Sequence, residues 1–244
     1  MVQVERPSAQ EFAKHKAREP HKLSNPLRDV ILGGQDGLVN ALGIILGFSA
    51  VSQDVHILIA TVMAATFAES ISMGAVAYTS AMSQKDYYFS ERKKVLEEIE
   101  KSPKMEREEI RQIFEQKGFT GKVLEEIVET ITKDKKTWQD ILMAEELKIS
   151  PIDTRDVLKS SVIVTIATTI GHLIPLIPFF FVNHQTGLIA SVVISAITLF
   201  IVGWYQAVTL VGSWWKSGLK LVAIGLGAAF IGFLIAKIFN VSVG

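Results

Sequence analysis

Five stretches of this chain are each long and apolar enough to cross a lipid bilayer, and this feature restricts the fold more than any other. A membrane-spanning helix needs about 20 mostly apolar residues to cross about 30 Å of hydrocarbon. The chain has 244 residues, a hydrophobic fraction of 49% and a mean hydropathy of +0.32, which is too apolar for an ordinary soluble domain. We therefore expect an all-α membrane protein with five transmembrane helices. The expected spans are Leu27–Val51, Val55–Ser80, Leu158–Val182, Thr186–Val211 and Leu219–Val241.

Charged residues are unevenly distributed and divide the chain into segments. No Asp or Glu follows Asp156, whereas charges are dense between Gln84 and Asp156. We expect an N-terminal tail, two membrane helices, a helical insert between spans two and three, and three further membrane helices. Their expected bounds are 1–26, 27–83, 84–156 and 157–244.

The basic residues predict an orientation, because cytosolic loops carry an excess of Lys and Arg. Most of the 25 Lys and Arg residues lie in the N-terminal tail and in the insert. The turns at Ser52–Val55 and Asn183–Gln185 contain none, whereas Lys216 and Lys220 lie between spans four and five. We therefore expect the N-terminus and the insert in the cytosol, and the C-terminus on the opposite side.

The insert has the pattern of a small helical bundle. Helix breakers are absent between span two and the insert, so one long helix is expected to run from the membrane to Pro103. Apolar residues recur at helical spacing after it, and the later breaks fall at Gly118, Lys133-Asp134 and Pro151.

Glutamates of the insert form a candidate metal site. Residues three apart share a helix face, so Glu106 and Glu109 can converge, as can Met143 and Glu146. Clustered carboxylates with a thioether suit a divalent ion of intermediate character. Glutamate-rich helix surfaces are commonly just solvated, and this alternative stays open. The neighbouring acidic candidates are Glu97, Glu98, Glu100 and Glu145.

Two acidic residues lie well inside predicted spans, away from the span ends. Asp36 lies in span one and Glu69 near the middle of span two, with Met73 one turn later on the same face. An ionised carboxylate at the bilayer centre costs about 2.5–3.5 kcal/mol on insertion scales, and no Lys or Arg lies at a span centre to neutralise it. Protonated carboxylates bonded to neighbouring helices, a water-filled cavity or a bound cation would each explain them.

Span three contains a histidine and two prolines. For His172 we favour a buried, hydrogen-bonded side chain over a proton shuttle. Pro175 and Pro178 are expected to kink the span, which is tolerated where neighbouring helices satisfy the freed backbone.

Several classes of protein are disfavoured. The chain has no cysteine, which excludes disulfides, zinc–thiolate sites and iron–sulfur clusters. It has no HExxH, no GxSxG and no phosphate-binding glycine loop. We therefore expect neither an enzyme nor a resident cofactor, and no nucleic-acid partner.

Four segments together resemble the vacuolar iron transporter family. They are DGL in span one, ESISMG in span two, WQDILMAEEL at the end of the insert, and GHLIPLIPF in span three. The resemblance covers roughly Leu27 to Val241 and is taken to be to a bacterial or archaeal type of member. It implies a homodimer of five-span subunits that exchanges cytosolic Fe²⁺ or Mn²⁺ for protons.

The resemblance also implies residue roles. Asp36 and Met73 match the family's transport-site residues, and we expect Glu69 to join them. The insert matches a cytosolic metal-binding domain. Its implied metal ligands are Glu98, Glu106, Glu109, Met143 and Glu146, with Glu97, Glu100 and Glu145 as further candidates.

Three positions depart from the family pattern. Val95 stands where plant members have an additional glutamate, Leu142 replaces one of two paired methionines, and Ala77 stands where many members have a glutamate. We expect Glu69 to take over the last role. These departures bear on the number and type of metal ions bound.

We therefore expect an integral membrane antiporter that exports Fe²⁺, and also Mn²⁺, for iron homeostasis. The cell membrane is the expected location, or a vacuolar or other organelle membrane in a eukaryote. The alternatives are a membrane-anchored protein that senses metal or binds a partner without transport, and a divalent-cation channel.

Overall fold

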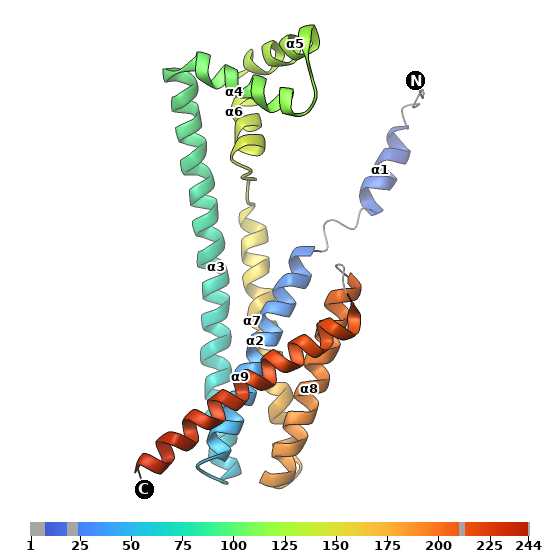
Figure 1. Cartoon of the computed structure of the whole chain (residues 1–244). Helices are drawn as coiled ribbons and strands as arrows, with labels where there is room; N and C mark the ends of the chain where they lie inside the picture. The colour runs from blue at the N-terminus through green and yellow to red at the C-terminus, as the bar shows by residue number, and fades with distance from the viewer. Residues whose placement is uncertain (1–7, 19–23, 210–212, 244) are drawn as a thin grey trace. The chain divides into compact units, whose positions relative to one another are not determined.

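The computed structural model describes residues 8–18, 24–209 and 213–243, so the predicted tail 1–26 and the predicted end of span four at Val211 lie partly outside it. Every regular element in these ranges is a helix (Figure 1). The elements are α1 (Ala9–Arg18), α2 (Ser24–Ser49), α3 (Val55–Lys101), α4 (Pro103–Gln116), α5 (Gly121–Thr132), α6 (Lys135–Ile141), the π-helix η2 (Leu142–Glu146), α7 (Thr154–Leu176), the 3₁₀ helix η3 (Ile177–Phe180), α8 (His184–Thr209) and α9 (Trp214–Val243).

The prediction of five helices suited to membrane spans is confirmed. Within the described residues, five helical segments are long and apolar enough to cross a bilayer. They are Pro26–Ser49, Val55–Lys101, Thr154–Phe180, His184–Thr209 and Trp214–Phe239. The expected long helix is also present, because α3 continues without a break for 47 residues and ends just before Pro103.

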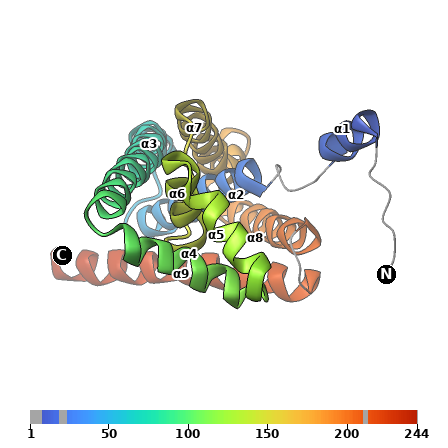
Figure 2. The same ribbon diagram turned by 90° about the horizontal axis from the view of Figure 1, so that it is seen from above.

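The chain divides into two compact units, which are described separately. The first contains Met1–Ala77 and Lys159–Gly244, and the second contains Tyr78–Leu158. In the first unit α9 packs across α2 and α8 (Figure 2). Leu38, Leu199 and Leu221, one from each of these helices, form a buried cluster at this crossing. A second apolar cluster joins α2, α3 and the end of α7 through Ile45, Leu58 and other buried side chains.

Span three changes helix type where the sequence predicts a kink. Pro175 lies inside α7, which ends at Leu176 and continues as η3 through Pro178. The hydroxyl of Ser191 on α8 donates a hydrogen bond of 2.7 Å to the carbonyl oxygen of Pro175. A neighbouring helix therefore satisfies a backbone group at the bend, as a membrane interior requires.

The second unit has its own apolar core. Ile110 of α4, Val128 of α5, Trp138 of α6 and Leu142 of η2 are all buried in it. The carboxylate of Asp134 caps α6 by accepting from the backbone N–H of Thr137 at 2.9 Å. The π-helix η2 was not predicted from the sequence. Such segments are rare and frequently mark functional sites.

Candidate functional site

The structure brings together Asp36 and Glu69, the two acidic residues predicted well inside the membrane spans. Asp36 on α2 and Glu69 on α3 are both half-buried, and their carboxyl groups lie within hydrogen-bonding reach of each other. Two carboxyl groups attract one another only when one of them holds a proton, because two carboxylates repel. The pair is therefore a place where the chain can store a proton or bind a cation.

Both oxygens of the Glu69 carboxyl group have a partner from another helix. The side-chain amide of Asn40, on α2, donates a hydrogen bond to Glu69 Oε1. On the other side, Nε2 of His172, on α7, lies 3.0 Å from Glu69 Oε2. Glu69 is thus held between α2 and α7.

The hydrogen bonds of His172 specify where protons must lie. Its Nδ1 is 3.0 Å from the backbone carbonyl oxygen of Thr168. A carbonyl oxygen only accepts, so Nδ1 carries a hydrogen. A bare Nε2 and an ionised Glu69 oxygen are both acceptors, so their contact needs one further proton on either group. His172 is fully buried, as the favoured interpretation of this residue expects.

A glycine in α2 makes room for His172. A Cβ atom on Gly37 would lie 2.7 Å from His172 Nδ1 and 2.3 Å from the carbonyl oxygen of Thr168, which are distances that side chains do not tolerate. A Cβ atom on Gly33, one turn earlier, would likewise lie only 2.6 Å from the carbonyl oxygen of Val164. The Gly33-xxx-Gly37 pattern therefore lets α2 and α7 approach closely, as small residues do in membrane helices.

Met73 lies one turn after Glu69 on α3 and is half-buried. Its place along the helix fits the prediction of a soft ligand at this level of the span. Within the described ranges, no three His, Asp or Glu side chains converge closely enough to hold a metal ion.

Four of the glutamates predicted in the insert interact with one another. They come from the end of α3, from α4 and from η2. They are Glu98, Glu106, Glu109 and Glu146. Burial, together with the charges of Glu109, Glu98 and Glu146, raises the pKa of Glu106 to about 7. Burial and the neighbouring Glu109 also raise the pKa of Glu146. The cluster is therefore a local concentration of carboxyl groups.

Met143 lies beside this cluster in the sequence but inside the core of the insert. Its side chain is 2% exposed and packs with residues such as Ile110. Val95 and Leu142, the two insert positions that depart from the family pattern, belong to the same core. Their apolar side chains thus serve packing in this chain.

The three further candidates of the insert have lysine partners. Glu97 pairs with Lys101 at 3.1 Å. Glu100 pairs with Lys135 at 2.9 Å, and Glu145 with Lys117 at 2.7 Å. The hydrogen bond from Lys101 lowers the pKa of Glu97, and that from Lys117 lowers the pKa of Glu145. The structure does not bring these three into the four-glutamate cluster.

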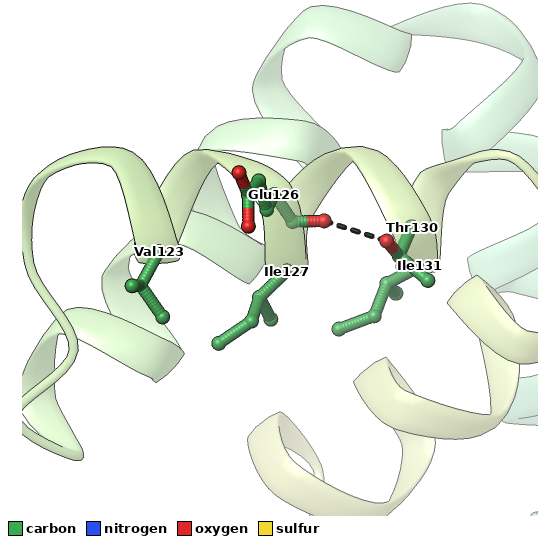
Figure 3. Close-up of a pocket in the computed structure, with 5 residues that line it drawn as sticks. All are labelled: Val123, Glu126, Ile127, Thr130 and Ile131. Carbon is green, nitrogen blue, oxygen red and sulfur yellow. Dashed lines mark hydrogen bonds between the residues drawn. The ribbon is translucent and has the colours of Figure 1, made fainter.

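An apolar recess on α5 lies apart from these carboxylates in the sequence. It is lined by Val123, Glu126, Ile127, Thr130 and Ile131 (Figure 3). Its single carboxylate, Glu126, lies 3.7 Å from Lys122, and the hydroxyl of Thr130 donates to the Glu126 backbone carbonyl. This surface therefore offers no metal chemistry of its own.

Sequence reasoning missed Asn40 as a site residue and did not connect His172 to Glu69. Asn40 follows Asp36 by one helical turn, so its position on the Asp36 face was an available signal. The contact of His172 with Glu69 joins residues 103 positions apart, and it depends on how α3 and α7 are rotated.

Comparison with known proteins gives a consistent match over nearly the whole chain. Residues 27–237 match the model of the VIT family. The chain is 30% identical to vacuolar iron transporter 1 of Arabidopsis thaliana, over 95% of this chain and 93% of that protein. It is 26% identical to the vacuolar iron transporter of Plasmodium falciparum, over 91% and 86% of the two chains. Protein CCC1 of Saccharomyces cerevisiae is 26% identical, over 87% and 68%.

Proposed function

Since the chain belongs to the VIT family, we propose that it transports Fe²⁺, and also Mn²⁺, out of the cytosol in exchange for protons. The chain is a multi-pass membrane protein, and its family is one of transporters and not of enzymes. Its relatives in Arabidopsis thaliana and Plasmodium falciparum are named iron transporters, which supports iron as the metal.

The observation that carries the proposal is the meeting of Asp36 and Glu69 within membrane-spanning helices. Each ionised carboxylate costs about 2.5–3.5 kcal/mol at the bilayer centre. A helix that only anchors a protein gains nothing from that cost, whereas a helix that binds a cation does. The thioether of Met73, together with carboxylates, favours Fe²⁺ or Mn²⁺ over Mg²⁺, which prefers an all-oxygen shell.

The contact between Glu69 and His172 supports the exchange for protons. One proton is needed between Glu69 Oε2 and His172 Nε2, and a cation bound to Glu69 competes with it. Export of a divalent cation against a negative-inside potential costs about 4.6 kcal/mol per 100 mV, at about 2.3 per charge. Inward movement of protons through the carboxyl groups of Asp36 and Glu69 offsets this cost.

We propose that the insert collects the metal. Glu98, Glu106, Glu109 and Glu146 supply carboxylates, and Met143 supplies a thioether after a rearrangement of its side chain. The high pKa of Glu106 reflects its burial and the charges of neighbouring glutamates, and a divalent cation would neutralise those charges. In this proposal the insert raises the local metal concentration for the site of Asp36, Glu69 and Met73.

Orientation and assembly complete the proposal. The basic residues of the N-terminal tail and the insert support a cytosolic position for both, so metal leaves the cytosol across the cell membrane or enters an organelle. A homodimer is supported by Ala60, Ala64 and Ala68, which form a stripe of small residues on α3 and are exposed on the single chain.

The test is Fe²⁺ uptake into liposomes that contain the purified protein, with the internal pH recorded at the same time. We expect uptake to require an acidic interior and to make that interior more alkaline. Equal uptake without a proton gradient would instead indicate a channel. Metal binding without any uptake would indicate a membrane-anchored sensor, and the transporter proposal would then be wrong.

A further inference from the structure

We infer that Asn40 and His172 are positioning residues, which clamp the Glu69 carboxyl group from two helices in the orientation needed to share a cation with Asp36. The inference rests on the proposed function, because it assigns two residues to the same membrane site. It concerns the direction in which Glu69 points and adds no ligand to the site.

The first argument is that each oxygen of Glu69 has its own partner. Asn40 Nδ2 donates to Oε1, and His172 Nε2 lies 3.0 Å from Oε2. A glutamate has three rotatable side-chain bonds, and holding it in one rotamer costs conformational entropy. Partners from α2 and α7 supply this restriction, so that the carboxyl group of α3 stays next to Asp36.

The second argument is that His172 is itself immobilised. Its ring is completely buried, its Nδ1 is bonded to the carbonyl of Thr168, and the backbone of Gly37 lies directly against it. Rotation of the ring would break the Thr168 bond and collide with α2. Nε2 is therefore the nitrogen that faces Glu69. A rigid partner of this kind is what orients a ligand-bearing side chain.

The third argument is the difference between two histidines of the same unit. His184, at the start of α8, is half-buried, and its Nε2 lies 3.1 Å from the hydroxyl of Ser49. Its hydrogen bond is to Ser49, and not to the carboxyl group of Asp36 or Glu69. His184→Gln is therefore a matched control for substitutions of His172.

The experiment measures initial rates of Fe²⁺ uptake against Fe²⁺ concentration in liposomes, under anaerobic conditions. His172→Leu removes both hydrogen bonds of the ring and keeps much of its volume. We expect its KM to rise about tenfold or more, as the loss of one bond to a carboxyl group predicts, with Vmax within about twofold of wild type. Asn40→Ala should raise KM about threefold or more, because an uncharged amide supplies a weaker bond. His184→Gln should leave both constants unchanged.

Two polar substitutions separate positioning from simple packing. The amide nitrogen of Gln can take the place of Nε2 and reach Glu69, whereas that of Asn takes the place of Nδ1 and reaches only Thr168. We expect His172→Gln to keep KM within about threefold of wild type, and His172→Asn to resemble His172→Leu. Gel filtration and thermal unfolding would reveal whether His172→Leu folds. If it does not, the Gln and Asn variants still distinguish positioning from packing.

A purely structural role predicts a different result, namely a lower melting temperature and Vmax in every His172 variant with an unchanged KM. That pattern, or equal KM values for the Gln and Asn variants, would overturn the inference while leaving the transporter proposal intact. Absence of metal transport by the wild-type protein would overturn the proposed function, and the inference would fall with it.

Discussion

The membrane unit and the insert both gather acidic side chains, but they hold them by different means. In the membrane, Glu69 has a neutral or basic partner on each oxygen, and these partners come from α2 and α7. In the insert, Glu106 and Glu146 face other glutamates, and burial and mutual repulsion raise the pKa of both. The membrane carboxyl group thus has amide and imidazole partners, whereas the insert carboxyl groups interact mainly with one another.

This difference indicates what each cluster can do. A carboxyl group with defined partners has one orientation, which suits selection of an ion and exchange of it for a proton. A cluster of like charges attracts any divalent cation and requires less geometry. We therefore expect loss of the Asp36 charge in the membrane to affect turnover, and substitutions in the insert to affect mainly apparent affinity.

The largest effect is expected for Asp36→Asn. The amide cannot ionise, so Fe²⁺ loses a charged ligand and the site loses a proton carrier. We expect uptake into liposomes to fall at least about a hundredfold, while metal binding by the insert is retained. Fully active Asp36→Asn protein would contradict the assignment of the site.

Asp54→Asn is the matched control for this substitution. Asp54 lies in the turn before α3 and caps that helix, because its Oδ1 accepts from the backbone N–H groups of His56 and Ile57. Asn caps helices about as well as Asp, so we expect uptake within about twofold of wild type.

The second effect is expected in the insert, for the double substitution of Glu106→Gln and Glu109→Gln. These residues lie on one face of α4 and interact with Glu146. We expect Mn²⁺ binding to the insert, measured by titration calorimetry, to weaken by about a hundredfold, at about tenfold for each lost charge. Uptake should show a higher KM and a nearly unchanged Vmax.

Glu108→Gln tests whether any glutamate of α4 would have the same effect. Glu108 lies between the two cluster residues but points to Arg111, with an Nε–Oε2 distance of 3.0 Å. We expect its substitution to change Mn²⁺ affinity by less than about twofold. Equal effects of Glu108→Gln and Glu109→Gln would mean that general surface charge, and not the cluster, attracts the metal.

The sequence predicted more of the insert cluster than of the membrane network, for a physical reason. Glu106 and Glu109 converge through helical spacing, which is a local property that the sequence contains. The five spans follow from length and apolar composition, which are equally local. The bonds of Asn40 and His172 to Glu69 depend instead on the rotation and depth of three packed helices. Small residues such as Gly37 permit that packing without specifying which polar groups meet.

The π-helix η2 shows the same limit at a smaller scale. The sequence predicted a helix that ends before Pro151, and the chain is helical there as far as Glu146. A π turn inserts one extra residue per turn and shifts the following side chains around the axis. Spacing arguments that place Met143 and Glu146 on one face assume an ordinary α-helix. The burial of Met143 beside the more exposed Glu146 is consistent with that shift.

The third effect is a pH dependence of the stability and Mn²⁺ affinity of the insert. The pKa of Glu106 is about 7 in the folded protein, against an ordinary value of 4.5. The folded state therefore binds more protons than the unfolded state between these values, and stability falls as pH rises from 4.5 to 7 and then levels off. Metal needs the ionised form, so Mn²⁺ affinity should rise about tenfold from pH 6 to pH 8.

Thermal unfolding and Mn²⁺ titration between pH 5 and pH 8 measure the two sides of this dependence. In Glu106→Gln protein the loss of stability with rising pH should be smaller, since the group that gains its charge in this range is absent. An unchanged pH profile in Glu106→Gln would show that other groups dominate, with Glu146 the next candidate because its pKa is also raised.

The smallest effect is expected for the glutamates that are paired with lysines, and Glu145 gives the sharpest case. Glu145 and Glu146 are adjacent in η2, yet Glu145 lies 2.7 Å from Lys117 Nζ whereas Glu146 faces Glu109. A surface ion pair contributes at most about 1 kcal/mol, and its lysine disfavours a second cation. We therefore expect Glu145→Gln to change Mn²⁺ affinity by less than about twofold, and Glu146→Gln to lower it about tenfold. A tenfold loss in Glu145→Gln would mean that the lysine pairs open when metal binds, in which case Glu97 and Glu100 would belong to the ligand set as well.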